Sequence, residues 1–345
     1  MKGYTEQKST VKQQSLKSAH YVLQQAIGFT YQGALRAAAE LKLADCLVDK
    51  AKTAEELALE TNTDAKILKR ILRTLVSRNI FTTDGNVNFA LNPEATFLCS
   101  NHPFSIRQAI LMLTDKTFWL PANNLNQYAY GNNSFEEIFG MPFFDYWELH
   151  INHPDNFHNG MSELSRVENE FVLNSIKFPE NITVADIGGG TGTLLLSVLK
   201  REPSLKGILF DTEAVLKKHI LSQLNDDTRW QLCSGSFFEQ CPEADIYLLK
   251  YITHDWSDEK IQQILHTIHK AMKPSSKLLI IDNIIPEGDQ PYFGKEMDLI
   301  MMTSFSGASE HTQSEFSTLL SYANFKMNNV ISTGCHLYII EAVPV

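Results

Sequence analysis

The sequence is poor in the features that mark several classes of protein. Its five cysteines are odd in number, far apart and never spaced as C-x-x-C, so neither a disulfide framework nor a structural zinc site is expected. It contains no run of about 18 uncharged apolar residues, and its first residues lack the apolar core of a signal peptide. These absences predict a cytoplasmic protein with no membrane partner and no metal.

Basic residues are also fewer than acidic ones. The chain has 30 Lys and Arg against 40 Asp and Glu, a formal charge of -10, whereas nucleic-acid affinity comes largely from basic side chains that release counterions. The charge is uneven, since residues 1–100 carry 13 basic and 10 acidic side chains while residues 101–345 carry 17 and 30. At about 100–200 residues per domain, the length suggests two domains, and nucleic acid is not an expected partner.

The first third has the element order of a winged helix. Residues 21–49 are rich in Ala and Leu, Thr53–Glu56 has capping-box spacing, and Asp64 starts a further helix whose apolar stripe runs to Leu75. Two β-prone runs around an Asp-Gly turn follow in residues 80–91.

Winged helices often bind DNA through a helix in the major groove, so a DNA-binding regulator is one alternative. Five basic residues lie on or beside the candidate recognition helix: Lys66, Lys69, Arg70, Arg73 and Arg78. The small net charge of this part and the long acidic remainder weigh against that function.

Residues 101–180 are helical in pattern and unusually aromatic. Most of these side chains are expected in the core, but an aromatic-lined cavity is also the usual site for a flat small molecule. The candidate pocket residues here are Phe139, Met141, Phe144, Tyr146, Phe157 and Met161.

The second half begins like a doubly wound α/β fold. A buried-strand pattern over 181–187 leads into the glycine-rich turn Gly188–Gly192 and then an apolar helix, and in such folds ligands lie beyond the carboxyl ends of the strands. A second strand ends at Asp211, 21 residues after Gly190, where a carboxylate can bind ribose hydroxyls. This arrangement predicts a cofactor that contains a nucleoside.

Two details narrow the cofactor. A dinucleotide-binding turn needs glycine at position 193, which is Thr, and no G-x-x-x-x-G-K-[ST] loop of an NTPase is present. A later strand delivers His254 at its carboxyl end, a position suited to a general base. A lone histidine would more often be structural.

The spacing of Asp186, Gly188, Gly190 and Gly192 resembles the first motif of class I S-adenosylmethionine methyltransferases. Lys250–Glu259 resembles the Lys-x-x-x-His-Asp-Trp-Ser-Asp-Glu block of their small-molecule O-methyltransferase family, which includes caffeic-acid-type plant enzymes, acetylserotonin O-methyltransferase and bacterial antibiotic-tailoring enzymes. Further blocks extend the resemblance along nearly the whole chain: residues 34–45, 53–58, 68–75, 139–146, 157–161, 235–239 and 298–316.

This resemblance implies a Rossmann-like methyltransferase sheet that a closing antiparallel hairpin completes. It divides the chain into a winged-helix dimerisation domain (1–100), a helical linker that contributes the substrate pocket (101–175) and a catalytic domain that binds S-adenosylmethionine (176–345). The enzyme would be a metal-independent homodimer that methylates a hydroxyl, expected to be phenolic, of a small aromatic or polyketide-like metabolite. Some relatives keep the fold and cofactor but perform a hydroxylation or a pericyclic step, which is the other alternative.

The resemblance also assigns roles to residues. His254 would remove the proton of the hydroxyl, with Asp282 and Glu310 flanking it. The cofactor would be held by Asp186, Gly188, Gly190, Asp211, Ser236, Phe237 and Lys250, and Met301 and Phe305 would join the pocket. Two positions depart from the family pattern, because Ser236 replaces an Asp and His311 replaces an Arg.

Overall fold

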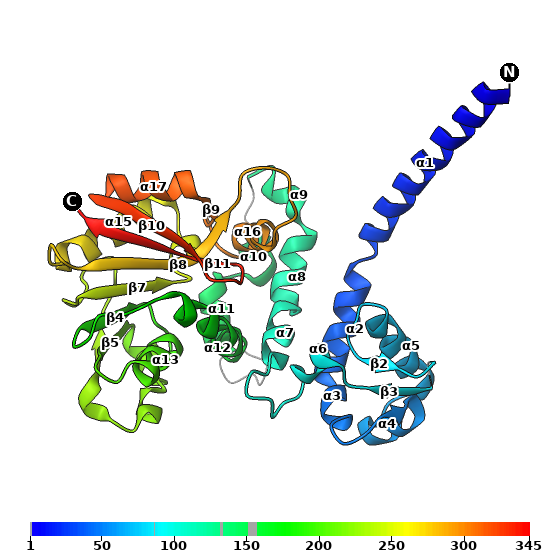
Figure 1. Ribbon diagram of the computed structural model, residues 1–345, viewed down its shortest axis with the longest axis horizontal. Helices are drawn as coiled ribbons and strands as arrows, with labels where there is room; N and C mark the ends of the chain where they lie inside the picture. Colours follow the sequence, from blue (N-terminus) through cyan, green and yellow to red (C-terminus); the bar gives the residue numbers. More distant parts are fainter. Residues whose placement is uncertain (1, 86, 132–133, 151–156) are drawn as a thin grey trace. The chain divides into compact units, whose positions relative to one another are not determined.

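The computed structural model describes residues 2–85, 87–131, 134–150 and 157–345 (Figure 1). The chain divides into two units, Met1–Thr114 and Asp115–Val345; the finer division at residues 100 and 175 stays a prediction. Among the described residues, no helix has both the length and the apolar character needed to cross a membrane.

The first unit is a set of helices around a small antiparallel sheet, in the strand order β1-β3-β2. A long first helix starts well before the predicted residue 21, and the predicted short helix, longer helix and hairpin follow in that order. The elements are α1 (Lys2–Ala26), α2 (Phe29–Glu40), α3 (Leu43–Cys46), β1 (Lys52–Thr53), α4 (Ala54–Thr61), α5 (Ala65–Val76), β2 (Thr82–Thr83), β3 (Asn88–Ala90), α6 (Pro93–Thr96) and α7 (Arg107–Leu113).

Local capping fixes where the helices of this unit start. The Thr53 hydroxyl accepts a hydrogen bond from the Glu56 amide at 3.1 Å, and the Glu56 carboxylate accepts one from the Thr53 amide at 2.7 Å, which confirms the predicted capping box. Asp64 caps α5 by accepting a hydrogen bond from the amide of Ile67 at 3.0 Å. The predicted apolar stripe of α5 is buried at Leu68, Leu72 and Leu75, where it forms part of the core of the unit.

Helices open the second unit and a sheet fills the rest of it. Before the sheet come α8 (Lys116–Asn123), α9 (Leu125–Tyr128), α10 (Ser134–Phe139), α11 (Phe143–Leu149) and α12 (Phe157–Ser175). The sheet region contains β4 (Thr183–Ile187), α13 (Thr193–Arg201), β5 (Lys206–Asp211), α14 (Glu213–Leu216), β6 (Trp230–Ser234), β7 (Ile246–Lys250), α15 (Asp258–Ala271), β8 (Lys277–Ile285), α16 (Phe293–Ser304), β9 (His311–Thr312), α17 (Gln313–Tyr322), β10 (Phe325–Ser332) and β11 (Leu337–Pro344), with short 3₁₀ turns at 221–224, 227–229 and 253–255.

The strand order of this sheet is β10-β11-β8-β7-β4-β5-β6, with β9 beside β8. Neighbours from β6 to β8 are parallel, whereas β11 runs antiparallel to both β8 and β10. This confirms the predicted doubly wound sheet with a closing hairpin. Because the carboxyl ends of parallel strands meet at one edge, the glycine turn, Asp211, Ser236 and His254 all follow strands at the same edge.

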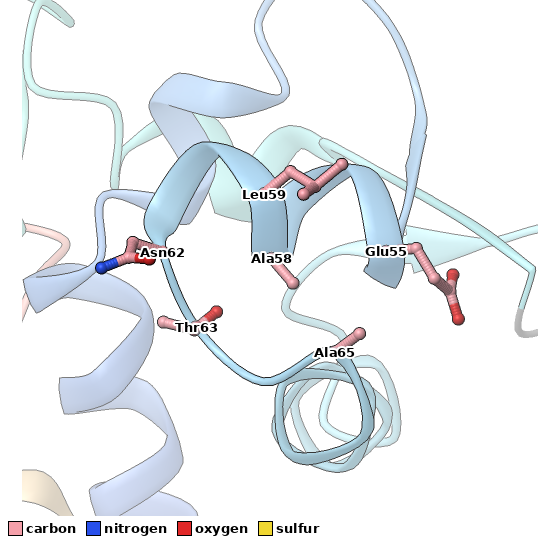
Figure 2. Close-up of a pocket in the computed structure, with 6 residues that line it drawn as sticks. All are labelled: Glu55, Ala58, Leu59, Asn62, Thr63 and Ala65. Atoms are coloured by element: carbon pink, nitrogen blue, oxygen red, sulfur yellow. The ribbon is translucent and has the colours of Figure 1, made fainter.

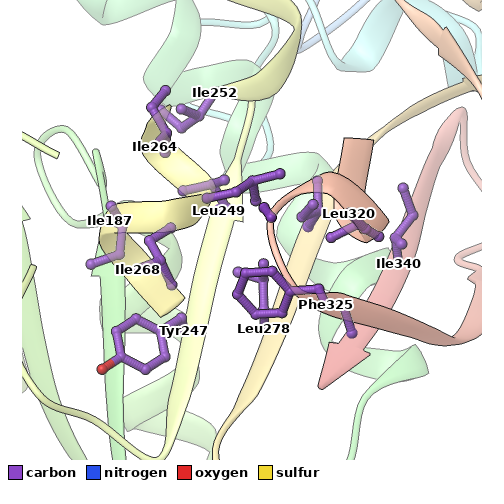
Figure 3. Packing of buried hydrophobic residues seen from close by; sticks show 14 of the residues in the cluster. Ile187, Tyr247, Leu249, Ile252, Ile264, Ile268, Leu278, Leu320, Phe325 and Ile340 are labelled. Carbon is purple, nitrogen blue, oxygen red and sulfur yellow. The ribbon is translucent and has the colours of Figure 1, made fainter. Parts of the chain in front are cut away.

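Helices cover both faces of the sheet. On one face α15 and α17 bury Ile264, Ile268 and Leu320 against the side chains of β7 and β8 (Figure 3). On the other face, α12 and α13 bury Val172, Leu195 and other apolar residues. Close packing of this kind contributes strongly to stability, since replacing one buried Leu or Ile by Ala costs roughly 2–5 kcal/mol. The sheet edge that carries the polar residues is thereby held on a rigid base.

Candidate functional site

The glycine turn follows β4 in a backbone conformation that favours glycine. Gly188, Gly190 and Gly192 have φ values of 67°, 60° and 86°, in the left-handed region that side chains disfavour. At Gly189 the constraint is space, because a Cβ atom would lie 2.6 Å from both the Asp186 carboxyl carbon and Leu209 Cδ1. Nothing lies within 4 Å of the Cβ position of Gly190, so a ligand has room to approach the backbone there.

Two carboxylates border this turn. Asp211, at the end of β5, accepts a hydrogen bond from the Gly190 amide at 2.9 Å, and burial raises its pKa. Asp186, at 1% exposure, lies beneath the turn, and burial raises its pKa to about 7. Its Oδ2 atom has no hydrogen-bond partner among the described residues. A buried polar atom of this kind is normally satisfied, which fits a polar ligand at the turn.

Ser236 and Phe237 follow β6 at the same edge. The Phe237 ring lies 3.4 Å from the Cβ position of Gly188 and packs on Phe238 and Trp256 at centroid distances of 4.9 and 6.1 Å. The Ser236 hydroxyl accepts a hydrogen bond from the Phe238 amide at 3.3 Å. A carboxylate, an open glycine turn and an aromatic ring are thus brought together as a cofactor with a nucleoside and an amino-acid part requires.

Lys250, the last residue of β7, is engaged inside the protein. Its ammonium group lies 2.8 Å from the Glu168 carboxylate and donates hydrogen bonds to Ser165 Oγ at 2.9 Å and Asn169 Oδ1 at 3.1 Å. A lysine ammonium has three N–H donors, and these three partners on α12 account for them. The predicted contact of Lys250 with the cofactor therefore stays a prediction without a free donor to support it.

His254 is surrounded by carboxylates. Its Nδ1 atom lies 3.0 Å from Asp282 Oδ1 and 3.1 Å from Glu310 Oε1, and its Nε2 atom lies 3.5 Å from Asp255 Oδ1. All of these side chains except that of Asp255 are at most 7% exposed. Because both neighbours of Nδ1 are acceptors, Nδ1 carries a proton and Nε2 is the atom that can accept another.

The carboxylates set the pKa values of this cluster. Burial alone would lower the pKa of His254, but the charges of Asp282 and Glu310 outweigh burial and raise it well above its ordinary value. Burial would raise the pKa of Asp282, but the histidine outweighs it and the pKa is lowered. At Asp255 the effect of burial outweighs the charge of His254 and raises the pKa of the carboxyl group to about 7. The arrangement favours a histidine that holds a proton strongly.

Several supporting residues were not predicted. Thr253 donates a hydrogen bond to Asp282 Oδ2 at 2.6 Å, Asn283 donates one to Glu310 Oε1 at 2.8 Å, and Asp298 accepts one from the Glu310 amide at 2.8 Å. Thr253 and Asn283 directly flank His254 and Asp282 in the chain, which is the one signal that could have indicated them. Their effect is to fix both carboxylates.

By residue type, His254, Asp282 and Glu310 could also hold a metal ion, since their ligand atoms lie within 4.8 Å of one another. Each carboxylate, however, is at hydrogen-bonding distance from the same imidazole nitrogen, and Asp282 and Glu310 accept further hydrogen bonds from Thr253 and Asn283. These contacts are those of a proton-holding cluster.

His311, which stands where the family pattern has Arg, lies at ion-pair distance from an acidic residue. The His311 Nε2 atom lies 3.1 Å from Asp258 Oδ1 at the start of α15, and the His311 side chain is 4% exposed. His311 thereby ties the segment that carries Glu310 to the helix after His254.

The predicted pocket aromatics form a connected set of ring contacts around the buried Phe143, and Trp147 joins Tyr146 to Phe157 at centroid distances of 5.7 and 6.3 Å. Phe144 contacts both Phe157 and Phe305, with ring centroids 6.2 and 5.0 Å apart, and Phe144 is 43% exposed. Phe139 and Tyr146 pack together at 5.0 Å on the side of Phe135. The segment after Phe305 contacts the segment that carries His254, since the Ser309 amide donates to the His254 carbonyl at 3.2 Å.

The three predicted methionines are less tightly grouped. Met301 is buried on α16, Met161 is partly buried on α12, and Met141 lies partly buried before α11.

A separate hollow of about 380 Å³ lies in the first unit, between α4 and α5 (Figure 2). Its lining is Glu55, Ala58, Leu59, Asn62, Thr63 and Ala65. One exposed carboxylate among small side chains provides no acid–base pair and no aromatic wall, so we assign the chemistry to the sheet edge of the second unit.

Comparisons with known proteins agree with this assignment. Residues 123–326 match the O-methyltransferase domain and residues 23–101 match the O-methyltransferase dimerisation domain. The phenazine O-methyltransferase PhzM of Lysobacter antibioticus is 34% identical over 327 residues, 94% of this chain and 96% of that protein. The mitomycin biosynthesis 6-O-methyltransferase of Streptomyces lavendulae is 30% identical over 309 residues, 87% of each chain.

A solved structure is similar along the same length. It is that of CalO1, a methyltransferase in calicheamicin biosynthesis, in its S-adenosylhomocysteine-bound form, with a TM-score of 0.89, 34% identity, and coverage of 96% of this chain and 99% of that one. The match to a dimerisation domain, together with the catalytic domain, leaves no support for a DNA-binding regulator. The chain belongs to the O-methyltransferase family and is an S-adenosylmethionine-dependent O-methyltransferase.

Proposed function

We propose that this enzyme methylates a phenolic hydroxyl of a flat, small aromatic metabolite and that His254 is the general base. The observation that carries the proposal is the buried His254 cluster, in which two carboxylates contact one imidazole nitrogen at 3.0 and 3.1 Å. The aromatic group of Phe144, Phe157 and Phe305 supports a flat substrate. The relatives' names, a phenazine and a mitomycin O-methyltransferase, support the same class.

The residues of the His254 cluster have separate roles in the proposed reaction. When bound, the cofactor supplies an electrophilic methyl group. His254 accepts the hydroxyl proton at Nε2, and the Asp282 carboxylate, whose pKa is lowered by the histidine, offsets the charge of the resulting imidazolium. A positioned base contributes roughly 10²–10⁴-fold to the rate, whereas alignment of two reactants can lower the barrier by about 7–11 kcal/mol. Holding the hydroxyl in line is therefore expected to contribute more than the base itself.

Residues at the sheet edge would hold the cofactor. Asp211 offers acceptors for the ribose hydroxyls, Phe237 offers an aromatic face to the base, and the backbone at Gly188 and Gly190 lets the amino-acid part approach. Support comes from the open space at Gly190 and the unsatisfied oxygen of Asp186. Ser236 provides a neutral hydroxyl where the family pattern has a carboxylate, which predicts a modestly weaker contact at that point.

A homodimer through the first unit is part of the proposal. The match of residues 23–101 to a dimerisation domain supports it. So do large apolar side chains on α1, since Tyr21, Val22 and Leu23 are 62–66% exposed, a pattern typical of an interaction surface.

The proposed reaction is tested with labelled S-adenosylmethionine and a panel of hydroxylated phenazines, naphthoates and quinones. We expect the product to gain one methyl group on oxygen and S-adenosylhomocysteine to form in equal amount. The same compounds with the hydroxyl already methylated are the matched control and should not react. A product that has gained oxygen, or has formed without S-adenosylhomocysteine, would instead support the non-methylating alternative.

The carboxylates around His254 predict a pH dependence. Since the pKa of His254 is raised above its ordinary value, the base is protonated at low pH, and kcat/KM should rise with pH through a midpoint above about 6.5. Asp282→Asn removes one negative charge, so it should lower that midpoint by about one pH unit and reduce the rate on the plateau.

The matched control for this charge removal is Asp227→Asn, which removes the same charge at an exposed position before β6. With one substrate throughout, titration of the substrate contributes equally to every profile. If the midpoint of the Asp282→Asn variant coincides with that of the wild type, Asp282 does not set the basicity of His254.

A further inference from the structure

We propose that Tyr251 is a positioning residue for His254, and that Glu168 and His336 hold Tyr251 in place. The inference rests on the proposed role of His254 as general base. The rings of Tyr251 and His254 are stacked, with centroids 5.1 Å apart and planes 21° from parallel. The hydrogen bonds at Nδ1 fix one atom of the imidazole, whereas a flat neighbour restricts the plane of the ring, and the two together fix the direction of Nε2.

The backbone at Tyr251 is held in a conformation that costs energy. Tyr251 has a φ of 58°, in the left-handed region where the backbone of a bulky residue is strained. Its amide donates to the carbonyl of Ile281 on β8 at 3.2 Å. Such a conformation persists only where the surroundings impose it, and here it ends β7 directly before the turn that carries His254.

The surroundings that impose it are polar and come from three parts of the unit. The Tyr251 hydroxyl donates to Glu168 Oε1 on α12 at 2.5 Å and lies 2.9 Å from His336 Nε2, in the loop before β11. His336 Nε2 is in turn 3.3 Å from Glu168 Oε1. Glu168 is 3% exposed and Lys250 lies 2.8 Å from its other oxygen.

The charge balance of this network keeps Glu168 ionised. Burial would raise the pKa of Glu168, but Lys250 and His336 outweigh burial and lower it. An ionised carboxylate is a stronger acceptor than a neutral one, so the Tyr251 hydroxyl is held firmly. Breaking a buried network of this kind by removal of one partner leaves the others unsatisfied.

The network also links the base to the pocket. Phe157, Met161, Ser165 and Glu168 succeed one another at helical spacing along one side of α12. The same helix therefore carries a predicted pocket aromatic at its start and the anchor of Tyr251 three turns later. Neither residue of the Tyr251–Glu168 pair forms part of the hydrogen-bond set at His254 Nδ1, so the stacked ring is the contact through which their side chains act on His254.

The test compares Tyr251→Leu, which removes the ring, with Tyr251→Phe, which keeps the ring and removes the hydroxyl. We expect Tyr251→Leu to lower kcat by about 10-fold or more and Tyr251→Phe by about threefold, at unchanged cofactor Kd and substrate KM, because a misdirected base affects the transition state alone. Tyr322→Leu, at a 66% exposed position on α17, is the control and should match the wild type.

A double-mutant cycle separates positioning from a merely structural role. In a His254→Ala background we expect Tyr251→Leu to cost nothing further, because its effect passes through the imidazole. Additive losses, or a wild-type kcat in Tyr251→Leu, would overturn the inference. If Tyr251→Leu does not fold, the cycle with Tyr251→Phe decides by the same criterion. If the wild type does not transfer a methyl group, or if His254→Ala keeps full activity, the proposed function is refuted instead.

Discussion

Replacing His254 by alanine lowers kcat by roughly 10²- to 10⁴-fold and leaves the affinity for S-adenosylmethionine nearly unchanged. The loss is large because Nε2 is the proton acceptor of the proposed reaction, and the carboxylates Asp282 and Glu310 at Nδ1 make the imidazole strongly basic. Affinity is spared because the glycine turn and Asp211, the proposed cofactor contacts, belong to other strands of the sheet. Single-turnover methyl transfer and calorimetric titration of the cofactor measure the two quantities separately.

The control for this variant is His266→Ala, at an exposed position on α15, which should match the wild type in both measurements. Turnover by His254→Ala at the wild-type rate, with an accepted substrate, would show that proton removal needs no base at this position. A parallel loss of cofactor affinity would show that the replacement disturbed the sheet edge as a whole.

Replacing Asp211 by alanine has the opposite effect, raising the Kd for S-adenosylmethionine by about 10- to 100-fold, since a hydrogen bond to a charged group contributes about 1.5–3 kcal/mol. Part of the loss in affinity has a cause within the protein, because the Gly190 amide no longer has the Asp211 carboxylate as its acceptor at 2.9 Å. At saturating cofactor, kcat should stay within about twofold of the wild type, since removal of binding that is equal in the ground and transition states leaves kcat unchanged.

Asp211→Asn keeps the shape of the side chain and loses its charge, so its Kd should lie between those of the wild type and the alanine variant. Asp227→Ala, at an exposed position before β6, is the charge-matched control. A Kd unchanged in Asp211→Ala would remove Asp211 from the cofactor site, and a fall in kcat as large as that of His254→Ala would mean that the two sites are not separable.

Local patterns in the sequence predicted local structure well. The Thr53 capping box and the cap at Asp64 depend on residues three positions apart, and their hydrogen bonds are as predicted. The same reason explains the glycine turn, since positive φ values at Gly188 and Gly190 follow from the residues themselves. Placement of His254 at a strand end also follows from the pattern of β7.

Contacts between segments far apart in the sequence are harder to predict. Lys250 is the last residue of β7, as the motif predicts. Its ammonium group, however, contacts Ser165, 85 residues away, and Glu168 on the same helix as Ser165. A buried cation requires a partner, but no local pattern says which of 40 acidic residues provides it. Thr253 and Asn283 escaped notice for the same reason, because their importance arises from the carboxylates they face.

The sequence by itself therefore determined the main elements and the doubly wound order, because these depend on periodicity and turn residues. Its motifs also resemble those of the methyltransferase family, a resemblance that implies His254 as the base. Only the tertiary structure decided that two carboxylates share one nitrogen of His254, that pocket aromatics pack around Phe143, and that Tyr251 stacks on His254. The physical reason is that packing and burial select partners across the whole chain. The scarcity of basic residues predicts that nucleic acid is not a partner, and the buried acids beside His254 support the proposed chemistry.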